Sequence, residues 1–146
     1  MGTIERRFFW IMICISMLLV HITFIVFDVN VYQYLFWPYI MGMISIIVFA
    51  AVVCGRMENL MKKIGPDPVI KQVKKIMSSI SFWGLFVIIT ALFAMDFYLL
   101  GQLFIPQDPA SGITNSIIIF LLLVHLITTV VASYIMRIVI SSKTKN

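Results

Sequence analysis

The sequence predicts an all-α integral membrane protein, a bundle of four membrane-spanning helices. Hydrophobic residues make up 62% of the 146 residues and charged residues only 12%. A soluble fold of this size could not bury so much apolar surface, whereas a lipid-facing exterior has no need to. Four long apolar runs and a one-sided distribution of basic residues support the same conclusion. We therefore treat residues 1–146 as a single membrane domain.

The four apolar runs cover residues 8–27, 35–54, 80–100 and 113–136. A helix needs about 20 apolar residues to cross about 30 Å of hydrocarbon, and each run is close to or above that length. Helices in the core of soluble proteins are rarely apolar on all sides over such a distance. Each run is therefore predicted to be a transmembrane helix.

All 11 Lys and Arg residues lie in three stretches of the sequence. They precede the first run, occupy the loop 56–79 between the second and third runs, or follow the fourth run. Basic segments stay on the cytosolic side of a membrane. The sequence thus predicts that both termini and the central loop face the cytosol, or the matrix if the membrane is the mitochondrial inner membrane.

The other two loops contain no basic residue, and acidic and aromatic residues mark this outer side. Asp28 and Asp96, near the outer ends of their helices, are expected to be solvated charges at the interface. Aromatic rings prefer the headgroup level. The aromatic side chains expected at the outer headgroup level lie at the start of the second run and are Tyr32, Tyr34, Trp37 and Tyr39.

The central loop 56–79 shows helical periodicity on both sides of a Gly-Pro-Asp-Pro turn. Its first part is predicted to extend the second span until Gly65 and Pro66 stop it. Asp67 is then expected to cap a new helix, with Pro68 at its first helical position. The apolar stripe of this second helix consists of Val69, Val73, Ile76 and Met77. The loop should therefore return to the membrane as a basic amphipathic helix.

The lysines of this loop are predicted to contact anionic lipids on the cytosolic side. They are Lys62, Lys63, Lys71, Lys74 and Lys75. Each basic residue near an anionic surface contributes about 1 kcal/mol of attraction. The alternative is that they only fix topology and extend their charged ends toward water.

Small residues four apart are candidates for helix packing, because helices associate in lipid through close contact of small side chains. The pairs are Ala51 with Gly55, Thr90 with Ala94, Thr128 with Ala132, and Thr129 with Ser133. The two cysteines, Cys14 and Cys54, lie inside apolar runs and are interpreted as small apolar fillers.

Two intramembrane histidines are the sharpest chemical candidates, since ionisable residues within the membrane are often functional. His21 and His125 are expected at nearly the same depth, about 20 and 17 Å from the basic side. Two imidazoles facing each other at one depth can ligate a haem b as its axial ligands. The alternatives are an interhelical hydrogen bond for each histidine, or a proton-relay or ion site. No metal site is predicted.

Elimination gives the functional expectation. The loops are too small to carry an active site, so an enzyme is not expected. The basic residues behind the net charge of +5 lie where they set the membrane orientation, so nucleic-acid binding is not expected either. The main prediction is a non-enzymatic accessory or structural subunit of a larger membrane complex, whose partners are lipids and other integral membrane subunits or further copies of itself. The alternatives are a haem b-binding electron-transfer anchor and an oligomeric channel or transport subunit. The membrane is predicted to be an endomembrane or the plasma membrane, with the mitochondrial inner membrane left open.

Overall fold

The computed structural model describes residues 2–27, 36–106, 112, 114 and 115–145, and this part of the chain is all-helical. It contains α1 (Thr3–Val26), α3 (Phe36–Ile64), α4 (Pro66–Met77), α5 (Ile80–Gln102) and α6 (Asn115–Lys145). Within the described ranges there is no β-strand. The all-α prediction is therefore confirmed.

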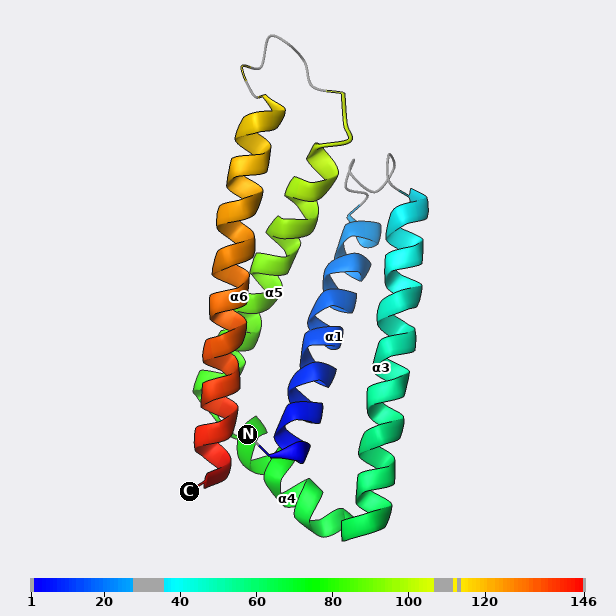
Figure 1. Cartoon of the computed structure of the whole chain (residues 1–146), viewed down its shortest axis with the longest axis vertical. Helices are drawn as coiled ribbons and strands as arrows, with labels where there is room; N and C mark the ends of the chain where they lie inside the picture. Colours follow the sequence, from blue (N-terminus) through cyan, green and yellow to red (C-terminus); the bar gives the residue numbers. More distant parts are fainter. Residues whose placement is uncertain (1, 28–35, 107–111, 113, 146) are drawn as a thin grey trace.

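Four of these helices are long and apolar enough to cross a membrane, which is consistent with an integral membrane protein. The shortest of them, α5, has 23 residues and is therefore about 34 Å long. Figure 1 shows the four running side by side, with α4 lying across one end together with the first turn of α1 and the last turn of α6. We call this the α4 end and the opposite one the far end.

The turn into α4 differs from the prediction by two residues. As expected, α3 continues beyond the apolar run to Ile64. Gly65 has a φ of 89°, a conformation that favours glycine, and it is the N-cap of α4. Pro66 is the first helical residue, so the prediction that Asp67 caps this helix was wrong. Proline suits that position because its fixed φ is helical and its missing N–H would be unpaired there.

The amphipathic character of α4 is confirmed by its packing. Val69 and Ile76 are buried, whereas its three lysines are exposed. The helix contributes these apolar residues to a core at the α4 end, where Phe8, Phe82 and Met136 meet from α1, α5 and α6. Met57 of α3 belongs to the same core, which therefore ties the loop helix to all four long helices.

The long helices form an open arrangement in which α1 lies between α3 on one side and α5 and α6 on the other (Figure 1). The most extensive contacts are between α5 and α6 and between α1 and α3, whereas α3 packs mainly on α1 and α4. Much of the surface of α3 and α6 is therefore apolar and exposed, as expected for helices that face lipid or other membrane helices.

The acidic and aromatic residues predicted on the outer side can be placed only in part, since Asp28, Tyr32 and Tyr34 lie outside the described residues. Trp37 is 72% exposed, in agreement with an interfacial position. Tyr39 is only 6% exposed, and its hydroxyl donates a hydrogen bond of 2.6 Å to the backbone carbonyl of Phe97. The interfacial assignment of Tyr39 was therefore wrong, because this ring joins α3 to α5 inside the protein.

Candidate functional site

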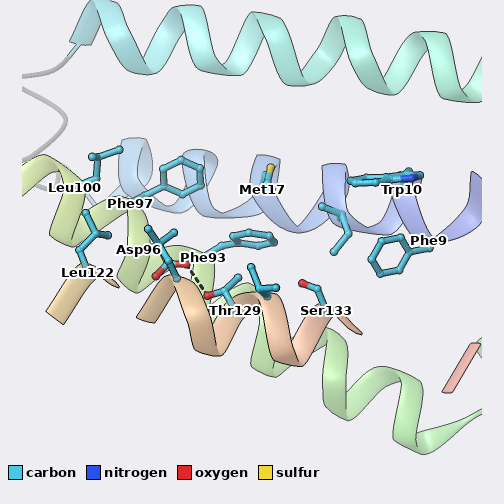
Figure 2. A pocket seen from close by; sticks show the side chains of 13 residues that line it. Phe9, Trp10, Met17, Phe93, Asp96, Phe97, Leu100, Leu122, Thr129 and Ser133 are labelled. Atoms are coloured by element: carbon cyan, nitrogen blue, oxygen red, sulfur yellow. Dashed lines mark hydrogen bonds between the residues drawn. The ribbon is translucent and has the colours of Figure 1, made fainter. Parts of the chain in front are cut away.

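A groove on the side of the protein, between α1, α5 and α6, has a volume of about 430 Å³. We call it the lateral groove; its side chains converge from the three helices in Figure 2. It is lined by Phe9, Trp10, Ile13, Met17, Phe93, Asp96, Phe97, Leu100, Leu122, Leu126, Thr129, Val130 and Ser133. On each helix these residues are spaced by three or four positions, with one adjacent pair, so each helix presents one continuous face. The groove reaches the surface, where Val130 is 69% exposed.

One wall of the lateral groove carries a polar pair, Asp96 on α5 and Thr129 on α6. The hydroxyl of Thr129 donates a hydrogen bond of 2.6 Å to Oδ2 of Asp96 (Figure 2). The other carboxyl oxygen, Oδ1, is buried and has no hydrogen-bond partner. Asp96 and Thr129 are only 7% and 5% exposed. The expectation that Asp96 is a solvated interface charge was therefore wrong.

The position of Asp96 explains why it is buried. It lies six residues before the end of α5, about 9 Å along the helix, and its side chain faces α6. A carboxyl group at such a site is costly unless it is paired, and intramembrane ionisable residues mark functional sites for this reason. Thr129 pairs one carboxyl oxygen, and the second oxygen can still accept a hydrogen bond.

His21 is packed into the contact between α1, α3 and α5. It is 2% exposed, and the rings of Phe97 and Tyr39 lie edge-on to the imidazole at 4.7 and 5.6 Å between centroids. Its Nδ1 is 2.8 Å from the carbonyl oxygen of Met17, which can only accept, so Nδ1 carries the hydrogen. The remaining nitrogen, Nε2, lies on the side of Gly42 in α3.

His125 lies in a different environment, on α6 and one turn from Thr129. Its backbone oxygen is 3.0 Å from the hydroxyl oxygen of Thr129 and is the more distant of two acceptors for the one hydrogen of that hydroxyl, the nearer being Oδ2 of Asp96. The Nδ1 of His125 is buried without a partner. The surroundings of His21 belong to α3 and α5, so the structure does not place the two imidazoles on facing surfaces of neighbouring helices. Haem ligation by the pair stays a prediction, and it would require the rings around His21 to separate.

The lysines of the central loop do not form one cluster. Lys71 and Lys75 line a cavity of about 310 Å³ at the α4 end, together with Ile4, Pro68, Gln72 and Thr144. We call this the basic cavity. Lys62 forms an ion pair of 2.6 Å with Glu58, both exposed, and Lys63 and Lys74 are exposed as well. Gln72, which also lines this cavity, has a side-chain oxygen, Oε1, that is buried without a partner.

Polar residues inside the helices also include Ser16 and Thr90, which connect α1 to α5. Their hydroxyl oxygens are 2.8 Å apart, and Thr90 donates its own hydrogen to the carbonyl of Phe86, so Ser16 is the donor between them. Ser16 is not among the residues predicted from the sequence to be functional. A polar side chain with apolar residues on both sides in the sequence is the signal that marks its inward-facing position, as it does that of Asp96.

No protein-family model, no curated protein and no solved structure matches this chain.

Proposed function

We propose that the chain is a non-enzymatic, multi-pass membrane protein that serves as an accessory or structural subunit of a larger membrane complex. The observation that carries this proposal is the position of α3. This helix of 29 residues flanks the protein and packs mainly on α1 and α4, so most of its length has an apolar surface with no neighbour among the described helices.

The outward face of α3 is built for close helix contact. Val53 is buried, and two residues along a helix change the direction of a side chain by about 200°. Ala51 and Gly55 therefore point away from the protein, and both are exposed. We call Ile44, Val48, Ala51 and Gly55, which share this direction, the α3 face. Small residues four apart let another helix approach closely, which is the main source of helix association in lipid.

The orientation that we propose follows the basic residues. The α4 end holds the lysines of α4 and the basic last turn of α6, so it would face the cytosol or, in mitochondria, the matrix. At this surface the basic cavity would receive the phosphate of an anionic lipid, because Lys71 and Lys75 line it together. An endomembrane or the plasma membrane would suit this orientation.

Photo-crosslinking from α3 tests the proposed function. A photoreactive residue at Ala51 should yield an adduct with one defined membrane protein in cells that express the full chain. The same residue at Val87, which is 65% exposed on α5, should yield lipid adducts only. Lipid adducts alone from both positions would contradict the proposal. Adducts of Ala51 only with a second copy of the chain would instead favour the oligomeric alternative.

A further inference from the structure

We propose that the basic cavity selects phosphatidic acid, a lipid whose headgroup is a bare phosphomonoester, over anionic lipids whose phosphate is a diester. This inference rests on the proposed function, which places the phosphate of an anionic lipid in this cavity, and it names the lipid. It starts from the two lysines of the cavity, Lys71 and Lys75, and from the turns of α1 and α6 that line it with them.

Three helices form the basic cavity. Pro68, Lys71 and Lys75 are spaced by three and four positions, so they share one face of α4. Ile4 in the first turn of α1 and Thr144 in the last turn of α6 complete the lining, and Figure 1 shows both turns beside α4. The volume of about 310 Å³ is at the lower end of the range for small-molecule pockets, which suits a small headgroup.

Lys71 and Lys75 bring two positive charges to the cavity. Neither forms an ion pair within the part of the chain that the structure describes. They are four positions apart on one helix, where like charges are destabilising. The acidic residues of the neighbouring turns, Glu5 and Asp67, do not line the cavity. An anion bound between the two lysines would therefore relieve their repulsion without meeting a carboxylate.

The number of charges favours a phosphomonoester. At neutral pH such a group carries about −1.5 to −2 charges on three terminal oxygens, which matches two ammonium groups. A phosphodiester carries a single negative charge on two terminal oxygens. Phosphatidylserine also has an ammonium group of its own, which Lys71 and Lys75 would repel. The two lysines therefore favour the lipid that holds the most negative charge on a single phosphate.

The depth of the cavity is that of a phosphate bonded directly to the glycerol of a lipid. Ile4 lies four residues before the first apolar run, which starts at Phe8. Thr144 lies four residues after Ile140, the last apolar residue of α6. Four helical residues span about 6 Å, and the headgroup region on each side of the hydrocarbon is about 5–8 Å thick. Phosphates on an inositol ring would extend farther from the hydrocarbon, so the cavity fits phosphatidic acid better than a polyphosphoinositide.

Native mass spectrometry of the full chain tests the selectivity with two lipids that have the same acyl chains. Phosphatidylmethanol differs from phosphatidic acid by one methyl group, which removes one ionisable oxygen from the phosphate. The parent protein should bind phosphatidic acid at least about fivefold more tightly, as expected for one additional charge. Glycerol 3-phosphate, the same phosphomonoester without acyl chains, should not displace the lipid at an equal concentration. Equal affinities for the two lipids, or displacement by glycerol 3-phosphate, would overturn the proposal.

Lysine variants show whether the cavity is the site that distinguishes the two lipids. In Lys71→Gln/Lys75→Gln the preference for phosphatidic acid should fall below about twofold, because the charges that read the headgroup are gone. In the matched variant Lys62→Gln/Lys63→Gln the preference of the parent should persist. All four lysines are exposed, so neither double variant should disturb the fold.

The outcomes separate this inference from the anionic-lipid site on which it rests. A parent without preference, whose affinity for both lipids falls equally in Lys71→Gln/Lys75→Gln, would contradict the selectivity and leave the site in place. Unchanged affinity of that variant for both lipids would contradict the site itself. A preference that persists in Lys71→Gln/Lys75→Gln would mean that other residues recognise the phosphomonoester, and the proposal would be wrong.

Discussion

Thr129 of α6 donates a hydrogen bond of 2.6 Å to Asp96 of α5, and this pair joins two long helices within the apolar part of the protein. The pair explains how an acidic side chain can be buried there. The second oxygen of Asp96, Oδ1, is buried without a partner. The same two residues therefore contribute to helix packing and define the polar end of the groove.

The Asp96–Thr129 pair predicts a specific pattern of stabilities. Thr129→Val should lower the free energy of unfolding by about 1 kcal/mol, the scale of a hydrogen bond between membrane helices. It also leaves both oxygens of Asp96 unpaired. The double variant Asp96→Leu/Thr129→Val should be more stable than Thr129→Val alone, because replacing both partners by apolar groups removes the unpaired carboxyl.

Unfolding of the reconstituted protein by a denaturing detergent measures these differences. The matched control is Thr128→Val, since Thr128 is exposed and bonds only to the carbonyl of Val124 on its own helix. Thr128→Val should lower the free energy of unfolding by less than Thr129→Val does. Additive effects of Asp96→Leu and Thr129→Val in the double variant would contradict the described pair.

The two histidines should differ in their effect on stability. His21→Ala removes a buried ring with two aromatic contacts, so it should lower the free energy of unfolding by about 2 kcal/mol. His125→Ala should lower it by less than about 1 kcal/mol. Detergent unfolding measures both variants. The purified protein should show no reduced cytochrome α-band. A sharp α-band that either His→Ala change abolished would instead establish haem ligation by this pair.

The basic cavity predicts which lysines bind anionic lipid. Lys71→Gln/Lys75→Gln should weaken binding of a phosphatidylserine to the full chain about 30-fold, at about 1 kcal/mol for each charge. Lys62→Gln/Lys63→Gln removes the same charge from exposed positions outside the cavity and should weaken binding much less. Native mass spectrometry of lipid adducts can compare them. If the two double variants lost the same affinity for phosphatidylserine, the lysines would have a role in topology only, and the proposed lipid site in the basic cavity would be contradicted.

The proposed orientation predicts which positions a membrane-impermeant thiol reagent can reach. In a Cys14→Ala/Cys54→Ala background, cysteines at Thr3, Ser78 and Lys143 should be labelled from the cytosolic side only. A cysteine at Pro106, which is exposed beyond the end of α5, should be labelled from the opposite side only. Labelling of Pro106→Cys and Lys143→Cys from the same face would contradict four spans.

The helices and the turn at Gly65 could be predicted because their signals are local. Apolar runs, basic segments and a Gly-Pro sequence act within one or two turns of the chain, so the existence of the four long helices and of the amphipathic α4 follows from them. The ends are less well predicted, because helices continue beyond their apolar runs: α1 begins five residues before the first run and α6 ends nine residues after the fourth. The error at Asp67 has the same local origin. Two prolines two residues apart both suit a first helical position, and the periodicity of α4 does not distinguish them.

The contacts between helices could not be predicted in the same way. The long helices are apolar on nearly all sides, so their sequences do not show which face meets a neighbour. Asp96 and Tyr39 were assigned to the interface from their depth alone, yet both point inward and bond to another helix. Conversely, Ala51 and Gly55 have the spacing of a packing pair but lie on the exposed side of α3. The depth of a residue in the membrane follows from its position in the sequence, whereas the direction of its side chain depends on the helix against which it packs.

The most direct test of the role as an accessory subunit compares two glycines that are both open in this structure. A Cβ at Gly55 or at Gly84 would meet nothing within 4 Å, so Gly55→Leu and Gly84→Leu should fold equally well. Gently solubilised membranes, resolved by native electrophoresis, then report the size of the complex that contains the chain. We expect Gly84→Leu to migrate with the large complex of the parent protein and Gly55→Leu to migrate as the free subunit. Identical migration of both variants with the parent would contradict assembly through the α3 face.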